Sequence, residues 1–296
     1  MRRPLREREQ RDDPGRTRIV ARDVEILRFI IEAQPVRTSH IAGLFGMSFD
    51  VTRRRLRVLR DHGLVRVFAQ ALDEENEVVL APAGKRYAEV QLGIDPSKLA
   101  TPRGLGGFTR EHHAMGVAFY VAVTNAIRSA PTVKVRHFAF EAELRRLTGN
   151  ARGAQVPDAA FIIEGPGGRR GFAVEVDTGS ERAAWVATRK ALPYGELHRR
   201  GDPLLGERAW AVLFVVPDTK RVAGLARAFL EAAADVTLFF FATADDVASG
   251  KIMAGGWRAV EVDEANEEAK LVGRSPFEAV LTAHPDRDDG RAHARP

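Results

Sequence analysis

Apolar residues recur every three or four positions over residues 19–62, which is the spacing of the buried face of an α-helix. Pro35 ends the first of these periodic runs, because the residue before a proline disfavours helical geometry. Gly46 ends a second, shorter run. Ser48 is a preferred helix cap and begins a third run that continues to about His62. The pattern therefore predicts three helices joined by short turns.

Two alternating runs, LVRVFAQ and EVVLAPAG, follow the third helix and flank the acidic turn DEEN, which predicts a β-hairpin. Three helices and a hairpin in this order resemble a winged helix-turn-helix domain. The resemblance implies that the third helix enters the major groove of double-stranded DNA. Its guanidinium groups suit phosphate, which they bind through two parallel hydrogen bonds. The candidate DNA-binding residues are Ser48, Thr52, Arg53, Arg54, Arg55, Arg57 and Arg60.

The second half of the chain alternates between helical and strand-like patterns. A helix from about residue 109 to 130 precedes three strands, a helix, a strand, a helix and a last strand. The second and third strands are joined by the turn GPGGRR and are expected to be antiparallel, whereas the late strand–helix–strand unit is expected to be parallel. A mixed sheet flanked by helices follows, so the predicted fold class is α/β.

Composition shifts along the chain predict its domain organisation. Arginine is concentrated in the first residues, proline and glycine gather between the two halves, and the last residues are polar with charges of both signs. The predicted segments are a disordered basic arm (1–18), a winged helix-turn-helix domain (19–91), a linker (92–108), an α/β domain (109–265) and a largely disordered tail (266–296).

Composition also limits the classes of function. The chain of 296 residues has no cysteine, which excludes disulfides, thiolate zinc sites and a cysteine nucleophile. No apolar run reaches the roughly 18 residues that a membrane span needs, so we expect a cytoplasmic protein without a membrane partner. The formal net charge of +5 favours nucleic acid as a partner, because the arginines are clustered. Winged helices also commonly form homodimers, so a homodimer is a further expectation for this chain.

Three carboxylates surround the ends of the second and third strands of the α/β domain. Asp158 begins the second strand, Glu175 lies near the end of the third, and Asp177 follows two positions later on the same face. If the two strands pair through the intervening turn, Asp158 and Glu175 come side by side. Oxygen ligands of this kind hold hard cations, so we expect Asp158 and Glu175 to bind Mg²⁺ or Mn²⁺.

These residues in this order of elements resemble the PD-(D/E)XK nuclease superfamily. With the winged helix, the sequence EVDTGSE and the later helical Lys190 and Tyr194, the chain resembles the replication-relaxation family of plasmid and mobile-element proteins. The resemblance implies a metal-dependent endonuclease that nicks DNA, with Asp158, Glu175, Asp177 and Lys190 as the catalytic candidates. The third position of the nuclease motif is normally lysine, and Asp177 occupies it here. Lys190, on the next helix, can replace that lysine from a different backbone position.

Structural roles remain open for each of these residues. Lys190 can pair with Glu175 without a metal, Asp158 can cap a turn, and Asp177 can belong to a turn before the helix. The second class of function is then a non-enzymatic transcriptional or replication regulator, in which the nuclease-like domain serves dimerisation or partner binding. Two aromatic residues of the same helix, Trp185 and Tyr194, are expected to pack in the protein rather than to stack on bases.

Overall fold

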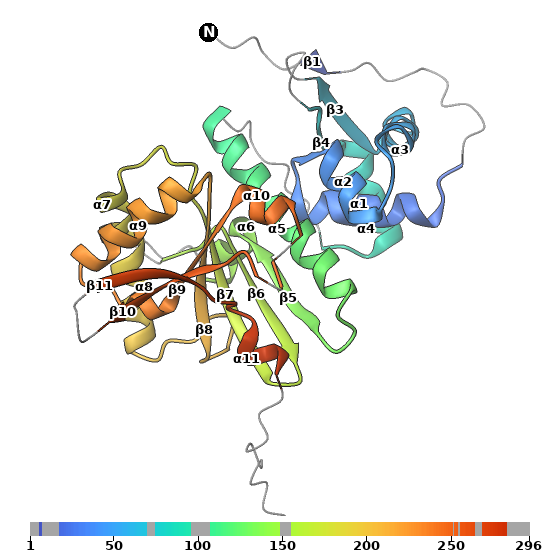
Figure 1. The fold of residues 1–296 in the computed structure, drawn as a ribbon. Coiled ribbons are helices and arrows are strands. Elements are labelled where there is room, and N and C mark those ends of the chain that lie inside the picture. Colours follow the sequence, from blue (N-terminus) through green and yellow to red (C-terminus); the bar gives the residue numbers. More distant parts are fainter. Residues whose placement is uncertain are drawn as a thin grey trace, which may run out of the picture. The chain divides into compact units, whose positions relative to one another are not determined.

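A computed structural model describes residues 6–7, 18–69, 75–95, 107–148, 155–250, 252–253, 255–263 and 268–282. The chain divides into two compact units. The first comprises Met1–Asn125 with Arg145–Asn150, and the second comprises Ala126–Leu144 with Ala151–Pro296. Each unit has its own sheet (Figure 1).

The first unit contains the three helices and the hairpin that the sequence predicts. Gly46 ends the second helix in a left-handed conformation, with a φ of 61°, and the Ser48 hydroxyl caps the third by accepting the Val51 N–H at 3.3 Å. A further helix follows the hairpin. The elements are α1 (Ala21–Ala33), α2 (Thr38–Phe45), α3 (Phe49–Asp61), β3 (Val65–Ala69), β4 (Glu77–Leu80) and α4 (Pro82–Leu92).

Two short strands widen the hairpin to an antiparallel sheet with the order β1-β3-β4-β2. β2 (Val36–Arg37) pairs with β4, and β1 (Arg6–Glu7) pairs with β3. The sequence predicted a disordered arm over residues 1–18, whereas Arg6 and Glu7 form a strand. The other residues of the arm, up to 17, lie outside the described ones.

α5 (Gly107–Arg128) contributes to the core of the first unit. Tyr120 stacks on Phe29 of α1 with ring centroids 5.7 Å apart, and His113 Nε2 lies 2.9 Å from the Ala33 carbonyl oxygen. The sequence analysis assigned this helix to the second domain, but its residues up to Asn125 group with the first unit. The predicted linker lies mostly outside the described residues.

The second unit is built on a seven-stranded mixed sheet with the order β11-β10-β9-β8-β7-β6-β5. β7, β8 and β9 are parallel, and every other neighbouring pair is antiparallel. This confirms the predicted mixed α/β fold. The strands are β5 (Lys134–Phe140), β6 (Ala159–Gly165), β7 (Gly168–Val176), β8 (Trp210–Val216), β9 (Phe239–Thr243), β10 (Arg258–Asp263) and β11 (Glu268–Gly273).

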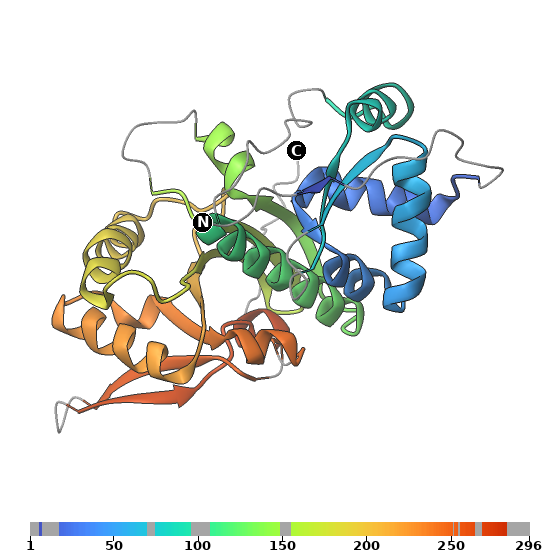
Figure 2. The same cartoon turned by 90° about the horizontal axis from the view of Figure 1, so that it is seen from above.

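The helices between residues 183 and 231 cover one face of this sheet, as Figures 1 and 2 show. Alternate side chains of β7 and β8, such as Ala173 and Phe214, pack in one apolar cluster with Phe229 of the helical layer. The helical segments along the chain are α6 (Glu141–Leu147), α7 (Ala183–Val186), η2 (Ala187–Ala191), α8 (Leu192–Arg199), α9 (Thr219–Glu231), η3 (Val236–Leu238) and α10 (Ala244–Ala248).

The opposite face of the sheet carries an aromatic cluster. Phe172 of β7 lies 5.1 Å from Phe161 of β6 and 4.9 Å from Phe277, measured between ring centroids. Phe277 directly precedes α11 (Glu278–Leu281). β11 and α11 thus occupy a region that the sequence predicted as a largely disordered tail, and residues 283–296 of that tail lie outside the described ones. Within the described parts of the chain, no helix combines the length and apolar character needed to cross a membrane.

Candidate active site and nucleic-acid interface

The register of β6 and β7 places Asp158 opposite Glu175. The antiparallel ladder pairs Ala159 with Val174, and the Asp158 N–H continues it by donating to the Val174 carbonyl oxygen at 3.0 Å. The next residues outward are therefore Asp158 and Glu175, which share one face of the sheet. The predicted side-by-side arrangement of these two residues is confirmed.

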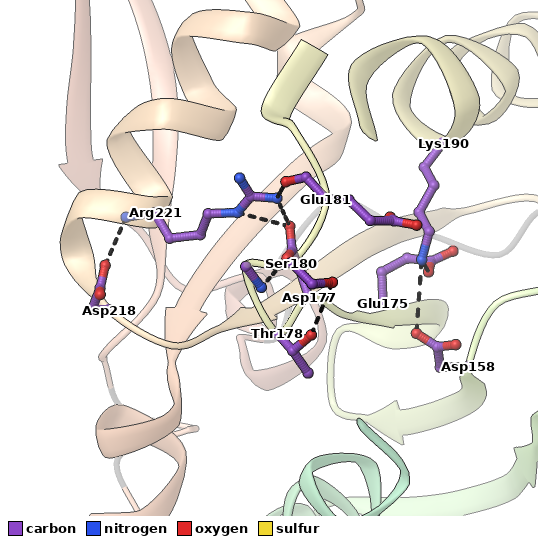
Figure 3. A network of polar contacts seen from close by, with 10 residues as sticks. Asp158, Glu175, Asp177, Thr178, Ser180, Glu181, Lys190, Asp218 and Arg221 are labelled. Atoms are coloured by element: carbon purple, nitrogen blue, oxygen red, sulfur yellow. Dashed lines mark hydrogen bonds and ion pairs between the residues drawn. The ribbon is translucent and has the colours of Figure 1, made fainter. Parts of the chain in front are cut away.

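Glu175 is buried under the helical layer, with 1% of its surface exposed. Its Oε1 accepts a hydrogen bond from the Tyr194 hydroxyl at 2.5 Å, and its Oε2 is ion-paired with the Lys190 ammonium. The same ammonium lies 3.9 Å from Asp158 Oδ2, which also accepts the Val176 N–H at 2.7 Å. Lys190 therefore stands between the two carboxylates, as Figure 3 shows. A buried carboxylate needs such partners, because desolvation without them costs several kcal/mol.

The electrostatics of the cluster follow from its burial. Burial raises the pKa of Glu175 to about 7, assisted by the nearby charge of Asp158 and opposed by Lys190 and Tyr194. Burial disfavours the charged form of Lys190, but the charges of Glu175 and Asp158 outweigh it and raise the pKa of Lys190. Lys190 consequently remains a cation at neutral pH. It can donate hydrogen bonds and stabilise negative charge, but it cannot act as a base there.

A wide helical turn carries Lys190. Over Ala187–Ala191 the helix is a π-helix, and the Leu192 N–H reaches back five residues to the Ala187 carbonyl. Pro193 follows directly and has no N–H for the Arg189 carbonyl, so ordinary α-helical bonding is interrupted at this point. The π-helical turn thus lies immediately before Pro193.

Asp177 belongs to a second network. Its Oδ2 accepts from Arg221 Nε at 3.0 Å and from Nη2 at 2.7 Å, while its Oδ1 accepts the Gly179 N–H at 2.6 Å. Arg221, on α9, also donates to the Glu181 carbonyl at 2.8 Å. Figure 3 shows this network beside the Lys190 cluster, with no drawn interaction between the two. Asp177 therefore fixes the turn after β7 to α9, in keeping with the structural alternative.

The donor set of the first network suits a hard cation in its chemistry. Asp158 and Glu175 supply carboxylate oxygens, and Mg²⁺ commonly takes one or two of these and keeps water in its other positions. The side chain of Asp158 is 18% exposed, which gives it access to solvent. Within the described residues there is no cluster of three or more histidine, cysteine or acidic side chains that could hold a metal ion.

The DNA-binding candidates on α3 separate into two groups. Ser48, Arg53, Arg54 and Arg57 are exposed, and the Arg53 guanidinium lies 4.7 Å from the centre of the Phe49 ring. The other three candidates make contacts within the unit. Thr52 is fully buried and donates to the Ser48 carbonyl. Arg55 forms an ion pair with Asp23, and Arg60 forms one with Asp61.

Arg55 connects two helices of the first unit through an ion pair. Asp23 on α1 is fully buried, accepts the Val20 N–H at 2.8 Å and takes the Arg55 guanidinium as its counter-ion. Arg55 thus holds α3 against α1. The outward face of α3 is left with three exposed arginines, Arg53, Arg54 and Arg57.

Comparison with protein families identifies the family of this chain. A model of the family described as replication-relaxation matches residues 27–203, which is more than half of the chain. The chain belongs to the replication-relaxation family. Comparisons with curated proteins and with solved structures give no match. The matched range includes α3 as well as Asp158, Glu175 and Lys190, so both candidate regions of this replication-relaxation protein lie inside the family's characteristic part.

The hydrogen bond between Tyr194 and Glu175 was not predicted by the sequence analysis, which expected the Tyr194 ring to pack rather than to stack on bases. Its ring is buried, but its hydroxyl donates to Glu175. Burial, the charge of Glu175 and this hydrogen bond raise the pKa of Tyr194, so the phenol stays protonated and remains a donor. The available signal was spacing, because Tyr194 follows Lys190 by four residues and so shares its helix face.

Proposed function

We propose that this replication-relaxation protein binds double-stranded DNA through α3 and nicks one strand at the site formed by Asp158, Glu175 and Lys190. The process served would be replication or relaxation of a plasmid or mobile element, as the family description suggests. The observation that carries the proposal is the Lys190 ammonium, which lies between two carboxylates at the ends of adjacent strands.

The residues divide the chemistry between them. Asp158 and Glu175 would hold Mg²⁺ or Mn²⁺, which polarises a phosphoryl oxygen and makes water a stronger nucleophile. Lys190 stays protonated, so it donates to a phosphate oxygen and stabilises the negative charge that develops there. Tyr194 fixes the orientation of the Glu175 carboxylate through its hydrogen bond. Lys190, which lies on the helix, thereby takes the role of the lysine that the nuclease motif normally has at the position of Asp177.

The DNA-binding half of the proposal is supported by the outward arginines of α3. Arg54 and Arg57 are exposed, and no carboxylate among the described residues pairs with them. Exposed arginines of this kind gain binding free energy by contacting phosphates, because each contact releases condensed counterions from the duplex. The affinity is accordingly expected to fall steeply as the salt concentration rises.

A nicking assay tests the enzymatic half. Supercoiled plasmid that carries candidate origin sequences is incubated with the full chain and Mg²⁺ or Mn²⁺. We expect open-circular product from the wild type and from Glu231→Gln, which removes an exposed carboxylate at the end of α9, and at least a hundredfold slower nicking by Glu175→Gln. Equal nicking by wild type and Glu175→Gln would assign the cleavage to another site or to a contaminant.

One observation favours a second candidate function. Both oxygens of Glu175 already have partners, Lys190 and Tyr194, so the cluster is stable without a metal. The protein would then be a non-enzymatic transcriptional or replication regulator, with the second unit serving homodimerisation or partner binding. This candidate predicts an intact plasmid in every metal, sequence-specific binding that survives Glu175→Gln, and a dimer in sedimentation equilibrium.

A further inference from the structure

Trp185 is exposed although most large aromatic residues of the second unit are buried. The sequence contains three tryptophans, and the two others are 4% exposed (Trp210) and 1% exposed (Trp257). Their indole N–H groups donate to the carbonyls of Asp202 and Ile252, at 2.9 and 2.8 Å. Trp185 is 44% exposed, and within the described part of the chain its indole has neither a ring contact nor a hydrogen bond. The expectation that it packs in the protein is therefore wrong.

Two exposed arginines lie within four residues of Trp185 in the sequence. Arg189 follows Trp185 by four residues, which places the two side chains on nearly the same side of the helical segment, and Arg182 lies three residues before it. Both arginines are exposed, and neither has a carboxylate partner among the residues that the structure describes. Arg221 and Arg258 in the same unit are, by contrast, paired with aspartates. Charge neutralisation inside the protein therefore does not explain Arg182 and Arg189.

The exposed group belongs to the segment that carries Lys190. α7 holds Trp185, and the adjoining π-helix holds Arg189 and Lys190 as consecutive residues. A ligand that covers Trp185 and Arg189 would therefore lie within about one helical turn of the Lys190 backbone. The surface is thus an extension of the candidate active site along the helix.

We propose that Trp185, Arg182 and Arg189 bind single-stranded DNA, with an unpaired base stacked on the indole and the neighbouring phosphates held by the two guanidiniums. An exposed indole offers a flat apolar face, and only an unpaired base offers a matching face, because bases in a duplex are already stacked. The flanking cations favour a polyanion over an apolar partner. The inference rests on the proposed function, because the bound strand would be the one presented to Lys190.

Intrinsic fluorescence can test the proposal, because Trp185 is the exposed fluorophore. The full chain is titrated with a single-stranded thymine oligonucleotide in EDTA at low salt, and separately with a blunt duplex of the same length. We expect saturable quenching by the single strand and much less by the duplex. In a parallel anisotropy titration with a labelled strand, Trp185→Phe should keep the affinity but lose most of the quenching.

Further variants test whether the quenched residue also contributes to the affinity for single-stranded DNA. Trp185→Ala and Arg189→Gln should each weaken single-strand binding about tenfold. The matched controls are Val262→Ala and Arg227→Gln, which remove an exposed apolar side chain and an exposed arginine elsewhere in the unit. Their affinities should stay within twofold of the wild type. An unchanged affinity of Trp185→Ala, or equal quenching by the duplex, would overturn the proposal.

The experiment separates this inference from the nuclease proposal. It contains no divalent ion, so binding is measured without cleavage, and Glu175→Gln should quench like the wild type. Quenching with an uncut plasmid would support the strand-binding surface and refute the nuclease. Nicking without quenching would support the nuclease and refute the strand-binding surface. Equal quenching by polyglutamate would show an acidic-peptide surface instead and would also overturn the inference.

Discussion

At the residue scale, the three carboxylates at the adjoining ends of β6 and β7 have different environments. Glu175 and Asp158 share the Lys190 ammonium, whereas Asp177 is bound by the Arg221 guanidinium. The first pair faces a cation on a helix that also bears the exposed Trp185. The second fixes a turn. Residues only two positions apart in the sequence thus have separate chemical roles.

Replacing Asp177 with asparagine tests its structural role. Arg221 would lose a charged acceptor in a largely buried position, so the free energy of unfolding should fall by about 2 kcal/mol. Urea denaturation measures this loss. Glu231→Gln, at the exposed end of the same α9, is the matched control and should change stability by less than about 0.5 kcal/mol. A loss no larger than that of the control would show that the ion pair contributes little.

His40 makes the stability of the first unit sensitive to acid. Burial, followed by the charges of Arg37 and His113, lowers the pKa of His40 from 6.5 to about 3. Its Nδ1 accepts the Arg37 N–H at 3.1 Å, which requires the unprotonated nitrogen. As pH falls below 6.5, the unfolded chain binds a proton that the folded chain does not. Unfolding therefore becomes more favourable by about 1.4 kcal/mol per pH unit until pH nears 3.

The variant His40→Asn isolates this effect, because asparagine retains an oxygen acceptor but does not titrate. The difference in unfolding free energy between wild type and variant should shift by about 2 kcal/mol in favour of the variant between pH 7 and pH 5. Chemical denaturation at the two pH values measures it. A difference that is independent of pH would mean that His40 is not held neutral by the fold.

At the element scale, the sequence predicted α3 and its cap but not which of its polar residues face outward. Periodicity places Arg53, Arg54 and Arg57 on solvent-facing positions, and they are exposed. The inward orientation of Arg55 depends on Asp23, which lies on another helix. A partner so distant in the sequence leaves no local signal, so Arg55 was counted among the DNA contacts.

Substitutions on α3 test its role as the DNA-binding element. Arg54→Ala and Arg57→Ala should each weaken duplex binding about five- to tenfold and reduce the slope of log affinity against log salt by about one. Arg28→Ala removes an equally exposed arginine from α1 and is the matched control, for which we expect no change. Anisotropy titrations over a range of salt concentrations provide both quantities. Identical salt slopes for all three variants would place the DNA contact elsewhere.

The register of the strand pair β6–β7 was predictable from the sequence. The helix after it was also predictable, but its wide turn was not. The tight glycine-containing turn fixes which residues face each other, and so Asp158 meets Glu175. The wide turn over Ala187–Ala191 has no comparable signature beyond the proline that follows it. It depends on packing of the helical layer on the sheet. Lys190 was consequently identified from residue type, and its position between the carboxylates was established by the structure.

At the scale of the whole molecule, the order of elements was predictable and their grouping was less so. α5 reads as an amphipathic helix, but amphipathicity does not say which core receives it, and its residues up to Asn125 lie with the first unit. β11 and α11 come from a polar region with few apolar residues. β11 pairs with β10, and the segment that leads into α11 is held by a contact with a sheet residue far earlier in the chain, Phe172 with Phe277. Tertiary contacts of this kind are absent from local sequence patterns.

The central claim is that Asp158 and Glu175, and not Asp177, hold a divalent ion next to Lys190. Calorimetric titration of the full chain with Mn²⁺ tests it most directly, using wild type, Glu175→Gln and Asp177→Asn, with circular dichroism to verify folding. We predict one bound ion for wild type and Asp177→Asn, and at least a tenfold weaker affinity for Glu175→Gln. Mn²⁺ binding that is equal in wild type and Glu175→Gln, or absent from wild type, would contradict the account.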